Sequence, residues 1–536
     1  MLFSSYEFIF VFLPVTLLVY ALLGKLSRDW ALAWVILASF AFYTWWRPMN
    51  LLIIAPSLVF NYFCGLLLLR LAADPAKQAT KNLVLAIGIA FNVLFLGYFK
   101  YANFAVTVAN DVTGADFVLE QIILPLGISF ITFQKIAFLV DVSGGRIERF
   151  TLRDYLLFVM FFPQLIAGPI VHYRESVPQF RNPVRVDGAL IAAALTLFVM
   201  GLAKKVLLAD GIALHVSPIY AAAAAGEQIS FIHAWLASIG FTLQIYFDFS
   251  GYSDMACGAA LLFGVRLPLN FDSPLKATNI IDFWLRWHMT LTRFLTAYVY
   301  NPVTLAITRW RAKNRRPLFR QKRSALFAFL HVVAWPTMLT MLLSGVWHGA
   351  GYTFIFWGAL HGLYLVINHA WRQYGAHKPG ALTIPARFTG WAFTFLAVVV
   401  AMVFFRAPDM NSAWNIVGGM VGGNGVALPG RLAELAPFGG AQLTLGGSEV
   451  YLSQLLQALA YLGGLLAIAL FMPNTSQLLA DYEPVLRGSE APPKIAGIGP
   501  LIRWRPRLHW MPLIGTLGAV AVLRLSGESE FLYWQF

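Results

Sequence analysis

Long blocks of apolar residues constrain the fold of this chain more than any other feature. A helix of about 20 apolar residues is long enough to cross the hydrocarbon core of a bilayer. Hydrophobic residues make up 59% of the chain and charged residues only 12%, against about 25% charged in an average soluble domain. We therefore expect an all-α, polytopic membrane protein. The predicted spans are 7–24, 30–46, 50–69, 82–100, 122–142, 188–203, 230–249, 283–305, 325–346, 351–369, 388–405, 452–471 and 510–524.

The basic residues are distributed as in a multi-pass membrane protein. The net charge of +14 would suggest nucleic-acid binding in a soluble protein, but here the positive-inside rule accounts for it and no nucleic acid is expected. Lys and Arg follow the first, third and fifth spans, which predicts an N-terminus outside the cytoplasm. The largest cluster, within 309–323, contains no acidic residue. It is either an orientation signal that attracts anionic lipid or, in addition, a rim that attracts a phosphorylated donor.

The charge alternation fails at segment 154–171, because basic residues flank it on both sides. This segment has a Phe-Pro pair at 162–163 and an Ala-Gly-Pro run at 167–169, which a straight spanning helix disfavours. We predict a re-entrant or broken segment, surrounded by protein or by a water-filled cavity. A glycine-rich loop at 407–450 is expected to face outward, and the turn that holds His348 is expected to lie away from the cytoplasmic face or deep in the bilayer.

Two Trp-His pairs, Trp287-His288 and Trp347-His348, lie in apolar surroundings. A polar ring at membrane depth usually faces the interior of a helix bundle or a water-filled cavity. Imidazole exchanges protons near neutral pH, so it can accept a proton from a hydroxyl during acyl transfer. Glycines at 345, 349 and 351 are expected to leave room for a substrate beside His348. Packing histidines remain an alternative for both pairs.

Other polar residues are candidates for lining the same site. Asp282 and Arg286 are four residues apart and are predicted to pair on one face of a helix, and His288 and Thr292 share another face. Asp248 and Ser250 fall at the end of the span 230–249 and form either an interfacial belt or a polar wall. The candidate substrate-binding or tunnel-lining residues are Trp347, Trp287, Asp248, Ser250, Arg286 and Thr292.

Several other kinds of site are not indicated by the sequence. No His, Cys and Asp spacing typical of zinc occurs, so no metal is expected. A serine-hydrolase elbow and a Walker A motif are also missing from the sequence. Cys64 and Cys257 lie in apolar stretches and are predicted to pack. His331, His361 and His369 are predicted to be packing or interfacial residues.

A set of motifs in fixed order resembles the membrane-bound O-acyltransferase family, most nearly its branch of bacterial alginate O-acetylation proteins. Relatives in that family serve cellulose and peptidoglycan acetylation and D-alanyl transfer. The matching stretches lie at 3–14, 124–134 (LPLGISFITFQ), 162–170 (FPQLIAGPI), 246–255 (YFDFSGYSDM), 282–291 (DFWLRWHMTL) and 345–350 (GVWHGA). The chain departs from the family at 296–297, where Thr296 and Ala297 replace a charged Arg-Asp pair.

The resemblance implies a ring of about 11–14 membrane helices, some tilted or re-entrant, around a central tunnel. It implies that His348 is the catalytic histidine and His288 the second histidine. Residues 1–475 would form the acyltransferase domain, and 476–536 a cytoplasmic loop with the last membrane helix.

The expected function is O-acyl transfer in the bacterial inner membrane. An acetyl group would pass from acetyl-CoA or an acyl carrier thioester, with no bound cofactor, to an extracytoplasmic hydroxyl of an alginate-like exopolysaccharide. The polysaccharide or a periplasmic acetyltransferase partner would be the acceptor. The alternatives are D-alanyl or other acyl transfer to a cell-envelope polymer, and a transporter or flippase without chemistry.

Overall fold

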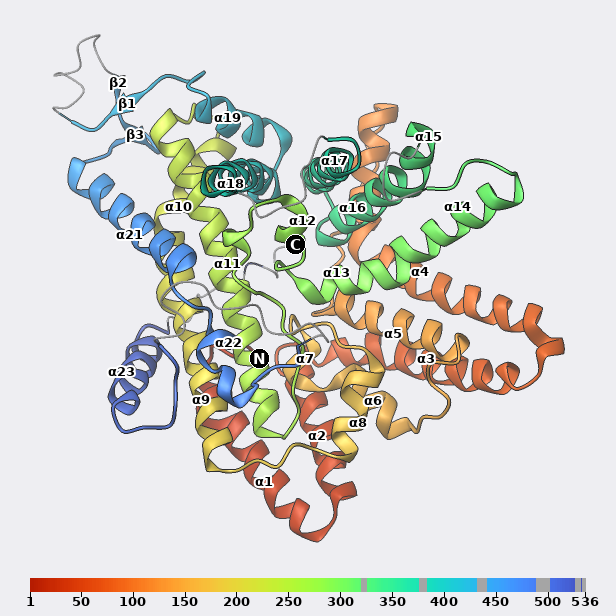
Figure 1. Ribbon diagram of the computed structural model, residues 1–536. Helices are drawn as coiled ribbons and strands as arrows, with labels where there is room; N and C mark the ends of the chain where they lie inside the picture. Colours follow the sequence, from red (N-terminus) through yellow and green to blue (C-terminus); the bar gives the residue numbers. More distant parts are fainter. Residues whose placement is uncertain (320–324, 376–382, 431–440, 488–501, 526–531, 533–536) are drawn as a thin grey trace.

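The computed structural model describes residues 1–319, 325–375, 383–430, 441–487, 502–525 and 532 (Figure 1). The expected all-α, polytopic membrane architecture is confirmed. Within the described residues, seven helical segments are long and apolar enough to cross a membrane. These segments are Glu7–Leu26, Met49–Ala72, Pro75–Thr113, Gly188–Ala224, Leu326–His348, Ile384–Arg406 and Leu452–Phe471.

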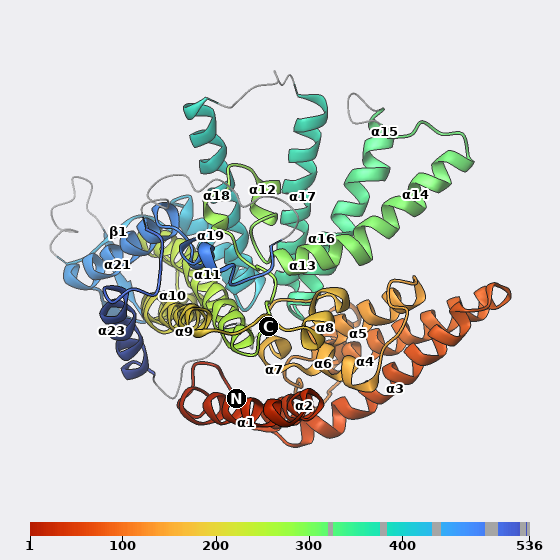
Figure 2. The same cartoon turned by 60° about the horizontal axis from the view of Figure 1, so that its bottom comes forward.

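The N-terminal helices form a layer along one edge of the molecule (Figure 2). A π-helical turn, Glu7–Phe12, leads into the first of them. The helices are α1 (Leu13–Leu26), α2 (Arg28–Thr44), α3 (Met49–Ala72), α4 (Gln78–Thr113), α5 (Ile128–Ser143), α6 (Leu152–Met160), α7 (Phe162–Leu165) and α8 (Tyr173–Arg181). As predicted, the segment 154–171 is broken, because the chain leaves the helix at Phe161 and turns into the short α7.

In chain order the remaining helices are α9 (Gly188–Ala203), α10 (Asp210–Ala224), α11 (Phe231–Leu262), α12 (Ile280–Trp284), α13 (Met289–Leu295), α14 (Asn301–Lys313), α15 (Leu326–Phe329), α16 (Trp335–His348), α17 (Tyr352–Tyr374), α18 (Ile384–Arg406), α19 (Met410–Met420), α21 (Leu452–Phe471), α22 (Thr475–Leu478) and α23 (Trp510–Leu523). Three π-helical turns join pairs of these helices, at Lys204–Ala209, Thr296–Tyr300 and Leu330–Ala334. Among the remaining helices, α9, α10, α18, α19 and α21 pack against a central helix, α11.

Helix α11 is buried along most of its length and forms the core of the molecule. It packs closely on α9 because glycines face each other: a Cβ on Gly251 would lie 2.6 Å from the carbonyl oxygen of Gly201. Small residues at such crossings let two backbones approach, as is common between membrane helices. Ion pairs also join α11 to the π-helical turn that follows α9. Lys204 lies 2.6 Å from Asp254, and Lys205 lies 2.8 Å from Asp248.

Several predicted boundaries are wrong. The span 230–249 continues to Leu262, so Asp248 and Ser250 lie inside a helix and not at its end. The lysine partners explain why a carboxylate is tolerated there. The span 122–142 becomes helical only at Ile128, after Gly127 adopts a left-handed conformation (φ 65°).

Two further segments differ from the prediction. The span 283–305 is not one helix, because the chain leaves α12 after Trp284 and starts α13 at Met289. The predicted loop 407–450 contains α19, which packs on α11, together with four two-residue strands. Of these, β1 (Ala427–Leu428) pairs in parallel with β2 (Ala441–Gln442), and β3 (Thr444–Leu445) pairs antiparallel with β4 (Ser448–Glu449).

Candidate active site

The two histidines of the Trp-His pairs lie next to each other in the core. The ring centroids of His288 and His348 are 6.4 Å apart. Their side chains are 1% and 4% exposed, respectively. Trp347 packs on both rings, with centroid distances of 6.2 Å to His288 and 4.8 Å to His348. Residues 60 positions apart in the sequence therefore form one buried site at the end of α16.

The turn before α13 holds His288 in an unusual backbone conformation. His288 has φ 42° and ψ 51°, in the left-handed region that non-glycine residues rarely occupy. The predicted span 283–305 is interrupted at this point, and His288 lies before α13 and not on a helical face shared with Thr292. Such strain persists only where the surroundings fix the conformation, and it is frequent at functional sites.

Asn270 supplies the contacts that fix this turn. Its backbone oxygen accepts a hydrogen bond from the amide of Met289 (2.9 Å), and its Oδ1 accepts one from the Thr290 hydroxyl (2.8 Å). The same Oδ1 lies 3.0 Å from Nδ1 of His288. An amide oxygen can only accept, so Nδ1 of His288 carries the proton in this contact. Nothing in the local sequence marked Asn270, because it lies 18 residues upstream of the histidine.

Helix α4 holds the end of α16 through hydrogen bonds to the last carbonyl groups of α16. The Tyr101 hydroxyl donates to the Val346 carbonyl (2.7 Å), and the Lys100 ammonium donates to the carbonyls of Trp347 and His348, the latter at 3.1 Å. The last carbonyls of a helix lack intrahelical partners, and a cation there also complements the helix dipole. The prediction missed Lys100 because it appeared to end a span. A lysine in a continuous helix at membrane depth was the available signal.

The glycines near His348 serve helix packing. A Cβ on Gly345 would collide with the Phe354 carbonyl of α17, and a Cβ on Gly358 would lie 2.5 Å from the Met341 carbonyl of α16. A Cβ on Gly349 would collide with the Phe354 ring. The expectation that Gly345 and Gly349 leave room for a substrate is therefore wrong, since α17 occupies that space.

On its other sides His348 contacts aromatic rings. Trp357 lies 5.0 Å and Phe405 5.2 Å from the imidazole centroid. The Trp357 ring also packs on His361, at 4.8 Å. His361 is fully buried, and its Nδ1 accepts a hydrogen bond from the Trp284 indole (3.3 Å). These rings exclude water from one face of the site.

A cavity of about 230 Å³ reaches both Trp347 and His348. Its walls come from the α2–α3 turn, Lys100 of α4, the segment before α5 and the chain after α7. Its lining residues include Tyr43, Trp46, Arg47, Asn50 and Lys100. A small molecule or a segment of a polymer can therefore reach His348 through this cavity.

A second cavity, of about 240 Å³, lies beside the first half of α16. It is mainly apolar, and its walls include Trp284, Thr292, Thr296 and Thr340. Thr292 also donates a hydrogen bond to the Trp284 carbonyl (3.2 Å). The predicted tunnel-lining residue Thr292 and the departure from the family at Thr296 therefore meet at this cavity.

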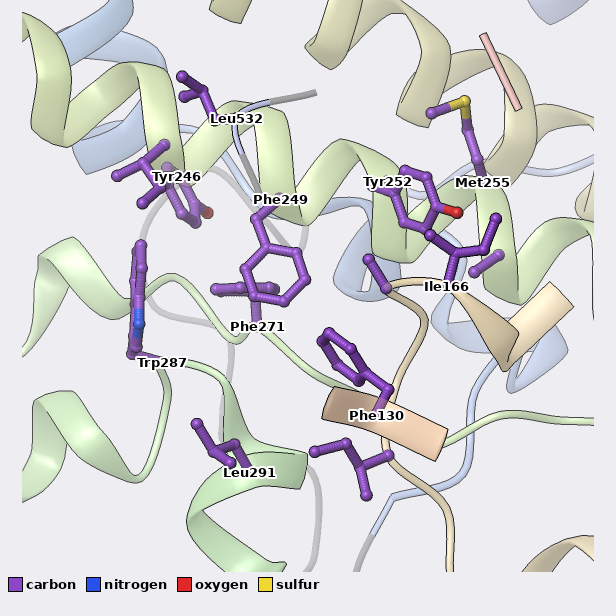
Figure 3. Close-up of a cluster of buried hydrophobic side chains, with 14 of the residues drawn as sticks. Phe130, Ile166, Tyr246, Phe249, Tyr252, Met255, Phe271, Trp287, Leu291 and Leu532 are labelled. Atoms are coloured by element: carbon purple, nitrogen blue, oxygen red, sulfur yellow. The ribbon is translucent and has the colours of Figure 1, made fainter. Parts of the chain in front are cut away.

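The other candidates lie outside these two cavities. Trp287 packs in the apolar cluster with Phe271 (5.1 Å) and Tyr246 (6.4 Å), as Figure 3 shows. The predicted pair of Asp282 and Arg286 forms, at 2.8 Å. Asp248 pairs with Lys205 and accepts a hydrogen bond from the Leu532 amide (3.3 Å), and Ser250 lines a small pocket beside Asn270.

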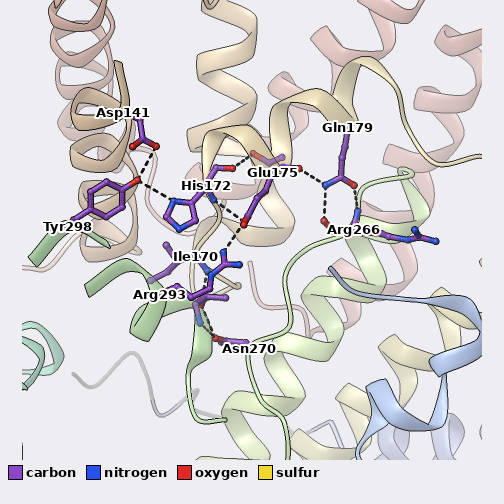
Figure 4. A network of polar contacts seen from close by, with 11 residues as sticks. Asp141, Ile170, His172, Glu175, Gln179, Arg266, Asn270, Arg293 and Tyr298 are labelled. Carbon is purple, nitrogen blue, oxygen red and sulfur yellow. Dashed lines mark hydrogen bonds and ion pairs between the residues drawn. The ribbon is translucent and has the colours of Figure 1, made fainter. Parts of the chain in front are cut away.

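A polar network joins α13 and its following turn to α5 and α8 (Figure 4). Tyr298 donates to Asp141 (3.0 Å) and lies 3.2 Å from Nδ1 of His172, while Arg293 pairs with Glu175 (2.8 Å). Burial lowers the pKa of His172 below its ordinary value, so the ring is neutral near pH 7. This network anchors the broken segment beside the histidine site.

The arrangement suits acid–base chemistry in a dry environment. Two buried imidazoles lie next to each other, aromatic rings surround them, and one of them, His348, lines a cavity. In the part of the chain that the structure describes, no group of three or more His, Cys, Asp or Glu side chains is placed to hold a metal ion. The fold and the site thus define a helical membrane protein with a buried pair of histidines, of which His348 lines a cavity.

Comparison with known proteins identifies the family. Residues 40–327 match the model of the membrane-bound O-acyltransferase family. A peptidoglycan O-acetyltransferase of Helicobacter pylori is 39% identical over 467 residues, covering 82% of this chain and 83% of that protein. A probable alginate O-acetylase of Pseudomonas aeruginosa is 35% identical and covers 100% of both chains. A teichoic acid D-alanyltransferase of Streptococcus thermophilus is 27% identical over 54% of this chain and 69% of that protein. The chain belongs to the membrane-bound O-acyltransferase family and is a multi-pass acyltransferase.

Proposed function

We propose that the protein moves an acetyl group from a cytoplasmic thioester to a hydroxyl outside the cytoplasm, in O-acetylation of an envelope polysaccharide of the alginate type. The donor is acetyl-CoA or an acyl carrier protein. The acceptor is the polysaccharide itself or a periplasmic partner that passes the acetyl group on. The protein resides in the bacterial inner membrane. The observation that carries the proposal is the buried His348 at the wall of a cavity, with the ring centroid of His288 6.4 Å from that of His348.

In the proposed reaction His348 is the general base. Its imidazole takes the proton of the acceptor hydroxyl as the oxygen attacks the thioester carbonyl, and the departing thiolate then takes up that proton. His288, held by Asn270, positions the donor or, once Nε2 is also protonated, stabilises the developing negative charge on the carbonyl oxygen. The aromatic rings around His348 limit hydrolysis of the thioester.

The relatives support this proposal over the alternatives. Two of them are named as O-acetyltransferases or O-acetylases and match most or all of the chain, whereas the D-alanyltransferase matches about half of it. All three names describe acyl transfer, which favours an enzyme over a transporter or flippase. D-alanyl transfer is therefore the second candidate.

The test measures the amount of ester-linked acetyl on envelope polymer from cells that carry His348→Ala, compared with wild-type cells at equal protein level. We expect a loss of about 10²-fold or more, since acid–base catalysis contributes ~10²–10⁴ in rate. His215→Ala, in the half-buried part of α10, is the matched control and should retain acetylation. Unchanged acetylation in His348→Ala would contradict the role of His348. Ester-linked D-alanine in place of acetyl would favour the second candidate.

A further inference from the structure

The cavity beside His348 is positively charged, and the proton transfer proposed for His348 does not require this charge. Two cationic side chains, Arg47 and Lys100, line it, and no carboxylate lines it among the described residues. In the described part of the chain neither cation forms an ion pair within 4.0 Å. Charged groups near a membrane protein's core are costly unless they are paired or functional. We infer that this cavity binds an acceptor that is an anionic carbohydrate, an inference that rests on the proposed function.

Lys100 places positive charge next to the reacting group. Its ammonium donates to the carbonyl of His348 at 3.1 Å and lies 6.0 Å from the Trp347 ring centroid. An ammonium has three donors, and the carbonyls of Trp347 and His348 take two of them. An anionic group that accepts the third is held beside the imidazole. A hydroxyl on the same sugar unit is then within reach of the base.

Arg47 supplies the second contact from the turn between α2 and α3. Its guanidinium is half-buried at the cavity wall. The planar guanidinium matches a carboxylate with two parallel hydrogen bonds, which adds orientation as well as affinity. The α2–α3 turn lies on the outer side in the charge-based topology, where an extracytoplasmic acceptor would arrive.

The other walls suit a sugar. Tyr43, Trp46 and Trp347 present aromatic rings, and Asn50 presents an amide. Aromatic walls with a few placed polar groups are typical of small-ligand sites. The volume of about 230 Å³ is below the usual range of ~300–1,000 Å³, which favours one unit of a polymer over a folded segment of a partner protein.

The test is equilibrium binding to the purified full-length protein in lipid nanodiscs. The probes are a tetrasaccharide of 1,4-linked uronic acids and the same tetrasaccharide with every carboxylate methyl-esterified. We expect the acid form to bind about tenfold more tightly or better, as for one charge-assisted contact. Arg47→Gln should reduce this preference to the part that Lys100 supplies, and Arg47→Lys should restore only some of the loss, because an ammonium does not form the two parallel hydrogen bonds of a guanidinium. Lys25→Gln, an exposed cation on the opposite side, should leave it unchanged.

The preference is a ratio within each variant, so a partly unfolded sample does not imitate the effect. Equal binding of the two tetrasaccharides to the wild-type protein, or no binding of either, would overturn the inference and favour a protein acceptor. A glycerol phosphate oligomer that binds as tightly as the acid tetrasaccharide would overturn the carbohydrate assignment. The binding preference is measured without donor and without turnover, whereas the acetylation assay reports the reaction, so failure of the proposed function is distinguishable from failure of this inference.

Discussion

At the scale of one residue, Asn270 holds both the backbone turn at His288 and the orientation of its ring. Its backbone and side chain together hold the turn that places His288 in the left-handed conformation. Its Oδ1 also fixes the proton on Nδ1 of the imidazole, which leaves Nε2 with its lone pair. Catalytic side chains gain precision when supporting hydrogen bonds lock their orientation.

We expect Asn270→Ala to lower kcat by roughly tenfold or more, a fraction of the ~10²–10⁴ that acid–base catalysis contributes. The KM for the donor should change little, because the substitution affects the orientation of the ring and not the cavity wall. Asn270→Asp keeps an accepting oxygen and should restore part of the rate. Steady-state kinetics on purified variants checks this. An equal loss in Asn270→Asp and Asn270→Ala would contradict a role through hydrogen bonding.

At the scale of elements, contacts between backbones position α16, the helix that carries His348. Helix α16 meets α17 through Gly345 and Gly358, and α4 binds the last carbonyls of α16. The end of α16, and with it His348, is therefore held from two sides. A shift of either neighbour moves the imidazole with it.

Gly345→Ala should destabilise the protein by about 1–3 kcal/mol, the usual cost of overpacking a tight contact, and should lower activity. Gly463→Ala in α21 is the matched control, because a Cβ at Gly463 has no neighbour within 4 Å. An exposed helical glycine gains up to ~1 kcal/mol on replacement by alanine. Thermal unfolding in detergent, followed by fluorescence, compares the two. The same midpoint for both variants would contradict the packing role.

The arrangement of the whole molecule was predictable only in part. Apolar block length predicted most long helices, and the Trp-His pairs marked both histidines before their proximity was known. The break at His288 was not predictable, because Asn270 imposes it through a tertiary contact that helix periodicity does not contain. The continuation of α11 past residue 249 was missed because Asp248 resembled a span end, whereas Lys205 pairs with it. The contacts of Lys100 likewise depend on how α4 crosses α16.

The orientation of the molecule in the membrane remains a prediction from the charge pattern, and cysteine labelling tests it. Both native cysteines, Cys64 and Cys257, are buried, so the wild-type protein should give a low background. In right-side-out spheroplasts a membrane-impermeant maleimide should label Asp116→Cys and should not label Lys313→Cys. Both positions are exposed. The reverse pattern would place the N-terminus in the cytoplasm and invert the proposed direction of transfer.

The turn that carries Arg47 is separate from the scaffold that holds the histidines. Asn270, α4 and α17 contact the segments that carry His288 and His348, whereas Arg47 lies at the cavity wall between α2 and α3. With the inferred role of Arg47, acceptor preference would change with this turn while the contacts around the histidines stay the same. Such modularity would let one catalytic framework be retargeted to many surface polymers.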